Sequence, residues 1–280
     1  MATAPFRTVF ISDLHLGTRR AHGDMVLDFL RHTRCEALFL VGDITDNWAL
    51  KRRWFWNETH GAVLRALLDV AARGGTAVTY LPGNHDCEFR RLCGENVAGI
   101  RVCDDVVHET ADGRRVFVLH GDRYDGVVLS APWLEHLGGV LYEWAIRANL
   151  ALDRALRLMR FPGRSMASLL RHRAKRSGTF VAQFERSVVD EAKARGCDAV
   201  VCGHLHIPAH HHLDGVEYCN DGDWVDNCTA LVEHFDGRLE LIDWARDRER
   251  LLADAREDQA NVVAFPTAAR LSNGRLRETG

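Results

Sequence analysis

Strand-like and helix-like segments alternate along most of the chain. Runs rich in β-branched and aliphatic residues, which favour strands, cover residues 8–12, 36–41, 76–81, 114–120 and 198–204. Apolar residues at three- and four-residue steps, which favour amphipathic helices, occupy residues 23–32, 57–73 and 179–195. Toward the end, Asp214-Gly215 and Asp236-Gly237 separate further strand-like segments as hairpin turns do. This order predicts an α/β fold that ends in antiparallel strands, and most simply a layered sandwich.

The composition is that of a globular protein. Of 280 residues, 46% are hydrophobic and 27% are charged, and the net charge of −3 gives no basis for binding nucleic acid. No run of about 18 apolar residues is present that would cross a membrane, and residues 1–10 lack the basic and apolar regions of a signal peptide. None of the eight cysteines forms a C-x-x-C pair, so reduced and mostly buried thiols are expected. We therefore expect a cytoplasmic protein.

Two segments differ from the alternating pattern. Residues 130–178 have a helical and basic pattern, and residues 246–280 begin as an exposed charged helix and end in a polar stretch typical of a frayed tail. We predict a main domain over residues 1–245 that carries 130–178 as a helical, basic insertion. A charged and partly flexible tail over 246–280 follows it.

Each of the five strand-like runs ends in polar residues of kinds that bind metal ions. In chain order these are Asp13 with His15, Asp43, Asn84 with His85, His120, and His204 with His206. A single histidine or Gly-Asp pair at a strand end is usually a hydrogen-bonded loop residue. Five such clusters favour a shared site, because binding sites of open α/β sheets form beyond the carboxyl ends of the strands.

The residue types indicate the chemistry of such a site. Carboxylate, imidazole and amide ligands suit Mn, Fe or Zn and need no thiolate. One carboxylate that bridges two ions would give a two-metal site with the ions roughly 3.5–4 Å apart, which activates water and holds phosphoryl oxygens for in-line attack. We expect two divalent ions as cofactors, with Mn²⁺ in first place and Fe or Zn as alternatives.

In order along residues 8–244, the motifs D-x-H, G-D, G-N-H-D, H-G and G-H-x-H resemble those of the calcineurin-like metallophosphoesterase superfamily. The resemblance implies a four-layer α-β-β-α sandwich with a helical lid insertion. It implies one metal ion bound by Asp13, His15, Asp43 and His206. A second ion would be bound by Asp43, Asn84, His120 and His204, with Asp43 as the bridge.

The same resemblance gives roles to the residues of the G-N-H-D motif. The histidine of this motif meets the phosphate or the leaving group in that superfamily, so His85 is the candidate catalytic residue and, with Asn84, binds substrate. Asp86 is expected to orient His85. An extended backbone would explain the spacing of His204 and His206, because residues two apart point the same way and one segment can serve both ions.

A narrower set of motifs is similar to the UDP-2,3-diacylglucosamine hydrolases, bacterial enzymes of lipid A synthesis. They are ISDLHLG at 11–17, GDITDNW with Trp48, a long insertion after His120, and the closing segment 222–244. The similarity implies attack of water on the α-phosphorus of the pyrophosphate, release of UMP and a diacylglucosamine 1-phosphate, and a lid over the sugar and acyl chains. The best-known members carry arginine where this chain has His85. Arginine binds phosphate as a fixed cation, whereas histidine can also donate a proton.

Two further surfaces each have two interpretations. Residues 48–56 combine three tryptophans with three basic residues, and form either an aromatic rim for a nucleotide or lipid, with Trp48 as a substrate-binding candidate, or a helix face packed on the lid. The insertion carries a basic stripe that either binds lipid phosphates and a membrane surface or is simply solvated. The stripe residues assigned to substrate binding are Arg157, Arg160 and Arg164.

The three histidines at 210–212 invite a metal assignment. On a strand, however, neighbouring side chains face opposite sides, so the three are not expected to converge.

Three functions are compatible with the sequence. The first is hydrolysis of UDP-2,3-diacylglucosamine or a related nucleotide-linked or phosphorylated lipid, with the protein bound peripherally to the cytoplasmic face of the inner membrane. The second is the same two-metal chemistry on another phosphomonoester, phosphodiester or phosphoprotein. The third, a non-enzymatic scaffold, ranks last because none of the seven predicted ligands is missing.

Overall fold

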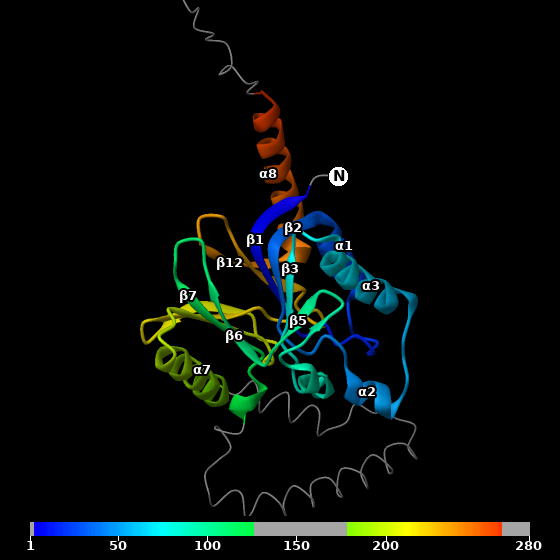
Figure 1. Cartoon of the computed structure of the whole chain (residues 1–280), viewed down its shortest axis with the longest axis vertical. Helices are drawn as coiled ribbons and strands as arrows, with labels where there is room; N and C mark the ends of the chain where they lie inside the picture. The colour runs from blue at the N-terminus through cyan, green and yellow to red at the C-terminus, as the bar shows by residue number, and fades with distance from the viewer. Residues whose placement is uncertain (1–2, 126–177, 265–280) are drawn as a thin grey trace, which may run out of the picture.

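The computed structural model describes residues 3–125 and 178–264, and two β-sheets lie at its centre (Figure 1). One sheet has seven strands in the order β12 (Leu239–Asp243), β11 (Thr229–Glu233), β1 (Ala4–Ile11), β2 (Thr33–Leu40), β3 (Ala77–Tyr80), β5 (Ile100–Val102) and β4 (Asn96–Val97). The other sheet has five strands in the order β6 (Asp105–Glu109), β7 (Arg115–Leu119), β8 (Ala199–Cys202), β10 (Val216–Asn220) and β9 (Ala209–Leu213). The two sheets pack face to face and form the two inner layers.

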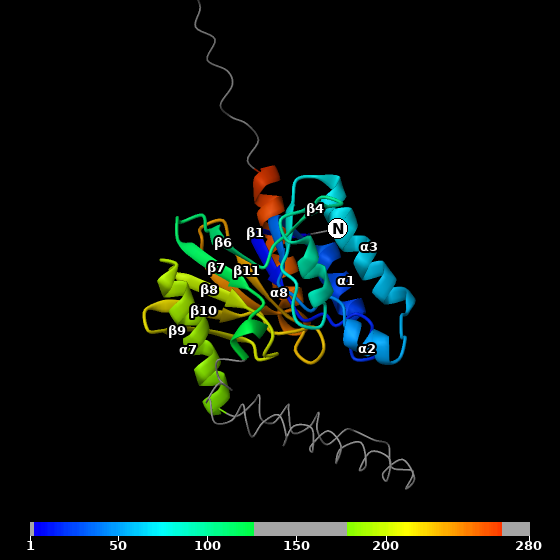
Figure 2. The same ribbon diagram turned by 60° about the horizontal axis from the view of Figure 1, so that its bottom comes forward.

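Helices cover the outer face of each sheet (Figures 1 and 2). The seven-stranded sheet carries α1 (Gly23–His32), α3 (Glu58–Arg73) and α8 (Trp244–Ala264), and the five-stranded sheet carries α7 (Gly178–Ala194). The short helix α2 (Asn47–Arg52) and the 3₁₀ turns η1 (Cys87–Leu92) and η2 (Asp122–Tyr124) lie in loops that follow the strands. The layers therefore follow the order α-β-β-α, which confirms the predicted sandwich.

Three apolar clusters fill the three spaces between the layers. Along β1, Val9 and Ile11 face the helices, where they pack with Phe29 and Leu67, whereas Phe10 faces the other sheet. Strand β8 alternates in the same way between the α7 side and the space between the sheets. Because both faces of these strands are buried, they are nearly continuous apolar runs, which is the pattern that predicted them.

The predicted elements agree closely with the observed ones. The helical patterns correspond to α1, α3 and α7, and both Asp-Gly pairs turn antiparallel hairpins, β9–β10 and β11–β12. All eight cysteines are free. In the described part of the chain, no helix is long and apolar enough to cross a bilayer.

The two segments that stood apart in the sequence have different outcomes. Almost all of the predicted insertion, 130–178, lies outside the described residues. The charged segment after residue 246 continues α8, and this helix is not exposed on all sides, because Leu251, Leu252 and Ala255 are buried. The predicted domain boundary at residue 245 stays a prediction.

The strands that carry the polar motifs point the same way. Strands β1, β2 and β3 are parallel neighbours, and so are β7, β8 and β10. In Figure 1, the carboxyl ends of β1, β2, β3 and β7 lie toward the lower side of the view. The loops that follow them therefore meet at one edge of the sandwich, as the sequence predicted.

A buried carboxylate, Glu233, links the two sheets. On the neighbouring strand β1, Thr8 Oγ1 and Arg7 Nη1 donate to it at 2.5 Å. From the other sheet, His108 Nε2 donates at 2.7 Å and the backbone N–H of Ala111 at 2.8 Å. Burial opposes ionisation, but these donors lower the pKa of Glu233 from 4.5 to about 2.

We expect Glu233→Gln to lower the free energy of unfolding at neutral pH by roughly 2–4 kcal/mol, because Arg7 and His108 lose a buried charged partner. Since the folded pKa is depressed, this contribution is present above pH 4.5 and is lost as the pH falls toward about 2. Urea unfolding of the two proteins across this range measures it, with Glu36→Gln at an exposed position as the control. A loss that stayed constant down to low pH would mean that packing, and not charge, explains the effect.

Candidate metal centre

The backbone is strained where the predicted ligands lie. Five of the seven have positive φ angles, in the left-handed region that non-glycine residues rarely adopt: Asp13 (53°), His15 (46°), Asp43 (53°), His204 (67°) and His206 (57°). Each such residue costs about 1–3 kcal/mol and persists only where its surroundings enforce it, which is typical of functional sites. The expectation of an extended backbone from His204 to His206 is therefore wrong, although the two side chains do reach different clusters.

Two motif glycines leave room for the carboxylates of the site. A Cβ on Gly83 would overlap Oδ1 of Asp43, and a Cβ on Gly203 would overlap Oδ2 of Asp13. In each loop, a backbone N–H just after the glycine donates to that same oxygen at 2.8 Å. The glycines thus let the loops after β3 and β8 approach and hold one oxygen of each carboxylate. The other oxygen of each is left to face the centre.

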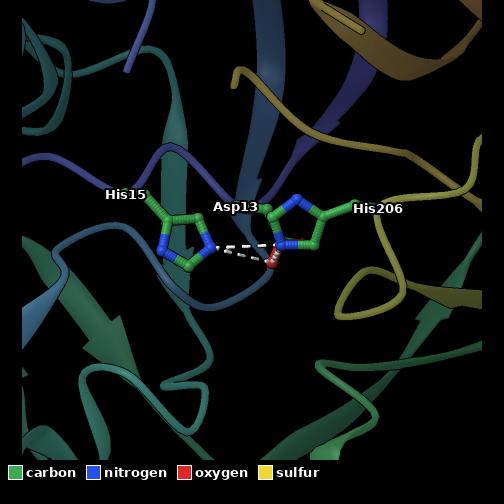
Figure 3. Close-up of side chains that lie close together, drawn as sticks. All are labelled: Asp13, His15 and His206. Carbon is green, nitrogen blue, oxygen red and sulfur yellow. Dashed lines mark hydrogen bonds and ion pairs between the residues drawn. The ribbon is translucent and has the colours of Figure 1, made fainter. Parts of the chain in front are cut away.

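One cluster consists of Asp13, His15 and His206 (Figure 3). Oδ1 of Asp13 lies 3.1 Å from Nε2 of His206 and 3.5 Å from Nε2 of His15, and the two nitrogens lie 3.2 Å apart. Each ring has a carboxylate behind it. Nδ1 of His15 lies 3.2 Å from Oδ2 of Asp46, and Nδ1 of His206 lies 3.8 Å from Oδ2 of Asp223. The Nε2 atoms are therefore the ones that face the cluster.

A second cluster consists of Asp43, His120 and His204, with Asn84 beside it. Nε2 of His120 lies 3.5 Å from Oδ2 of Asp43 and 3.3 Å from Oδ1 of Asn84. Nδ1 of His120 donates to a backbone carbonyl just after β2 at 2.8 Å. The same Oδ2 of Asp43 lies 3.7 Å from Nε2 of His15 in the first cluster. Asp43 is thus the residue that lies between the two clusters.

The atoms that converge here are hydrogen-bond acceptors. The Nδ1 atoms of His15 and His120 face a carboxylate and a carbonyl, so in a neutral ring they carry the proton and leave the Nε2 lone pair pointing inward. Oδ1 of Asp13 is buried, and none of the described residues donates a hydrogen bond to it. Converging lone pairs of carboxylates, imidazoles and an amide are costly unless a cation balances them. These residues therefore fit divalent metal ions.

The charges of the site indicate the same requirement. Burial alone would lower the pKa of His15 and His120, but the surrounding carboxylates raise both to about 10. Burial would raise the pKa of Asp43, yet His120 lowers it to about 2, and the charge of His206 holds the pKa of Asp13 well below its ordinary value. Protons on the histidines and metal ions are alternative ways to balance these carboxylates.

Comparison with known proteins identifies the family. The model of the calcineurin-like phosphoesterases matches residues 6–208. The chain belongs to the calcineurin-like phosphoesterase family. It is 30% identical over 261 residues to the UDP-2,3-diacylglucosamine hydrolase of Stenotrophomonas maltophilia (strain K279a), which covers 86% of this chain and 97% of the relative.

Relatives of the same name in other bacteria are similar at slightly lower identity. The one from Xanthomonas campestris pv. campestris (strain 8004) is 27% identical, over 82% of this chain and 96% of the relative. The one from Vibrio parahaemolyticus serotype O3:K6 is 26% identical, over 82% of this chain and 95% of the relative. These matches confirm the family resemblance that the motifs predicted. As a member of this family, the protein is a metal-dependent hydrolase.

In this phosphoesterase, His85 lies at the rim of the two clusters. Its Nδ1 is 3.0 Å from Oδ1 of Asp46. Its ring lies nearly perpendicular to the His15 ring at a centroid distance of 4.6 Å, and it contacts the Trp48 ring at 4.2 Å with the two planes tilted by 33°. Trp48 is 51% exposed, and about a quarter of the His85 side chain is exposed. A partly exposed histidine beside a buried cluster is well placed to meet a substrate.

Asp86 lies in a different place from the one expected. It is fully buried, its Oδ2 accepts the backbone N–H of Ile44 at 2.8 Å, and its Oδ1 accepts that of Gly83 at 2.7 Å. Burial and the charge of Asp43 raise its pKa. Asp86 thus ties the loop after β3 to the loop after β2. Among the described residues no contact supports the expectation that Asp86 orients His85, and Asp46 becomes the candidate for that role.

Three carboxylates near the clusters were not predicted from the sequence. Asp46 lies behind two histidines, Asp223 lies behind His206, and Oδ2 of Asp125 lies 2.8 Å from Nε2 of His204. A signal for the first was present, because metal-binding histidines usually donate their second N–H to a carboxylate and the GDITD motif contains one. Nothing in the local sequence indicates which histidine each of these carboxylates meets.

The histidines at 210–212 behave as the sequence predicted. Nε2 of His210 forms a hydrogen bond with Oε1 of Glu217 at 2.7 Å. His211 lies on the other side of the strand, where its Nε2 is 3.5 Å from Oε2 of Glu185 on α7. With Cys219 nearby, His210 and Glu217 are close enough to hold an ion. Glu217 is already paired with Arg114, however, so this group is an ion-pair network on the sheet.

The tryptophan-rich run is open to solvent at two of its three rings. Trp48 and Trp54 are 51% and 73% exposed, whereas Trp56 is partly buried against the core. The exposed rings are consistent with the aromatic rim. The alternative is that these rings pack on the insertion, which lies outside the described part of the chain. The predicted substrate-binding residues Arg157, Arg160 and Arg164 also lie outside it.

Proposed function

We propose that the protein hydrolyses the pyrophosphate of UDP-2,3-diacylglucosamine, or of a related nucleotide-linked lipid, with the help of two divalent metal ions. The observation that carries the proposal is the position of Asp43, whose Oδ2 lies between the inward Nε2 atoms of His15 and His120. A carboxylate between two ligand sets is what neighbouring ions share. The relatives named UDP-2,3-diacylglucosamine hydrolase support the choice of substrate.

Two overlapping sets of residues would hold the ions. One set is Asp13, His15, Asp43 and His206, and the other is Asp43, Asn84, His120 and His204. Their oxygen and nitrogen donors suit Mn²⁺, with Fe or Zn as alternatives. When bound, such ions lower the pKa of a water molecule and withdraw charge from the phosphoryl oxygens.

The side chains around the ions would then assist the attack of water and the departure of the leaving group. A water oxygen forms a bond to the α-phosphorus, the bond from that phosphorus to the bridging oxygen breaks, and UMP carries away the new oxygen. The lipid 1-phosphate keeps the bridging oxygen, which can take a proton from His85. Asp46, 3.0 Å from Nδ1 of His85, would hold the ring so that Nε2 meets the leaving oxygen. The exposed face of Trp48 would bind substrate beside it.

We expect kcat/KM for UDP-2,3-diacylglucosamine to exceed that for UDP-glucosamine by more than about tenfold, because each acyl methylene removed from water contributes about 0.8 kcal/mol. Both rates are measured at the same Mn²⁺ concentration, with bis(p-nitrophenyl) phosphate as a reference substrate that has no acyl chain. Equal rates, or no cleavage of the acylated nucleotide while the reference substrate is turned over, would favour another phosphomonoester, phosphodiester or phosphoprotein as the substrate.

The basic stripe of the insertion supplies a second arm of this experiment. Changing Arg157, Arg160 and Arg164 together to glutamine is expected to weaken sedimentation with anionic liposomes and turnover of the acylated substrate. Turnover of the small reference substrate should stay nearly unchanged. The matched control changes three arginines of the tail, Arg270, Arg275 and Arg277, in the same way. An equal effect of both triple variants would assign the result to net charge alone.

A further inference from the structure

Ser12 lies between two carboxylates beneath the first cluster. Its Oγ is 2.6 Å from Oδ2 of Asp13 and 2.6 Å from Oδ1 of Asp221. The carbonyl oxygen of Gly222 lies 3.3 Å away. All three neighbours are oxygens that accept hydrogen bonds when the two carboxyl groups are ionised. The three side chains are buried.

A count of protons decides which of these contacts is a hydrogen bond. A serine hydroxyl has one hydrogen to donate and two lone pairs to accept with. It can donate to one carboxylate only, so the other contact at 2.6 Å needs a proton on the carboxyl side. Two short contacts are satisfied together only if one carboxyl group is neutral and donates to Oγ of Ser12.

The surroundings show which carboxyl group carries that proton. Asp13 receives a second donor at Oδ2, the backbone N–H of His204 at 2.8 Å, and faces two histidines with Oδ1. Asp221 is fully buried, and within the part of the chain that the structure describes its Oδ2 has no hydrogen-bond partner. An ionised carboxylate with an unpaired buried oxygen is costly, whereas a neutral acid tolerates it better. Burial and the charge of Asp13 accordingly raise the pKa of Asp221 well above its ordinary value.

We propose that Asp221 is held as a neutral carboxylic acid that donates to Ser12, so that Ser12 donates to Asp13 and presents the remaining oxygen of Asp13 to the metal centre. The two donors on Oδ2 of Asp13 then leave Oδ1 as its only ligand atom. Asp221 is a positioning residue, since it acts through Ser12 and touches neither substrate nor ion. This inference rests on the proposed metal centre and specifies how one of its carboxylates is oriented.

The test is Mn²⁺ binding by the full chain, measured by calorimetry for Asp221→Asn, Asp221→Ala and Ser12→Ala. An asparagine amide donates to Ser12 as a neutral acid does, so Asp221→Asn is expected to bind Mn²⁺ nearly as tightly as the wild type. Asp221→Ala and Ser12→Ala are expected to bind about 10–100-fold more weakly, the usual effect of losing a partner that orients a ligand. Asp226→Asn, which changes an exposed carboxylate of the following loop, is the matched control.

Infrared difference spectra measure the protonation of Asp221 directly, which a purely structural role of this residue would not require. The wild type should show the C=O stretch of a protonated carboxyl group that disappears in Asp221→Asn. In Ser12→Ala it should shift to higher frequency, because its hydrogen bond is lost. Weak Mn²⁺ binding by Asp221→Asn, equal to that of Asp221→Ala, or the absence of this band would overturn the proposal. Failure of the wild type to bind Mn²⁺ would instead overturn the proposed metal centre.

Discussion

Replacing Asp43 with alanine is expected to abolish phosphodiesterase turnover and to release at least one metal ion. The reason is the place of its Oδ2, 3.7 Å from Nε2 of His15 and 3.5 Å from Nε2 of His120, where removal affects both ligand sets at once. The ions of a two-metal site contribute several kcal/mol to transition-state stabilisation, so a loss of about 10³-fold or more in kcat is expected. Turnover of bis(p-nitrophenyl) phosphate and elemental analysis of the purified protein measure the two effects.

The control for this variant is Asp69→Ala, which removes an exposed carboxylate on α3. It should keep the activity and the metal content of the wild type. Circular dichroism and thermal unfolding of Asp43→Ala separate loss of metal from loss of fold. Full metal content together with full activity in Asp43→Ala would refute the assignment of Asp43 as the shared ligand.

The fold could be predicted well from the sequence because both faces of its central strands are buried. The last residues of β1 and β2 and the whole of β8 are short apolar runs, and the polar residues after each run mark the point where the chain leaves the sheet. Parallel strands bring such points to one edge, so the convergence of residues far apart in sequence followed from topology alone. Helix periodicity was equally clear in α1, α3 and α7, each of which buries one face.

The parts of the site that were not predicted depend on geometry that periodicity does not carry. The left-handed backbone at His204 and His206 turns these side chains to different clusters, whereas an extended backbone was assumed. Asp86 follows His85 directly but turns away from it to hold two loops, and Asp46, 39 residues earlier in the numbering, lies beside the ring. Adjacency in sequence is a poor guide to side-chain contact in such loops, because each φ angle redirects the next side chain.

We expect His85→Ala to lower kcat by roughly 10²–10⁴-fold, the usual effect of removing a general acid–base group, while the protein keeps its metal ions. His85 belongs to neither of the two proposed ligand sets, although its ring lies close enough to His15 and Asp43 to form a possible metal-binding group with them. Its backbone N–H, which alanine retains, donates to Asp43 at 2.8 Å. Activity on bis(p-nitrophenyl) phosphate and metal content are measured on the same preparations. Rates like those of the wild type would mean that His85 neither donates a proton nor binds phosphate.

Two further variants separate the roles that a histidine and an arginine can have at this position. If charge on the phosphate is what matters, His85→Arg should sustain turnover of a pyrophosphate substrate, because a guanidinium binds phosphate as a fixed cation but does not give up a proton. If proton donation matters, His85→Arg should be as slow as His85→Ala on substrates with a poor leaving group and recover on p-nitrophenyl esters, whose leaving group needs no proton. Asp46→Asn tests the orienting carboxylate and is expected to slow turnover less than His85→Ala does, because it removes only the negative charge beside Nδ1 and leaves the imidazole in place. Since Asp46 also lies 3.2 Å from Nδ1 of His15, the same variant should weaken metal binding, an effect that His85→Ala should not share.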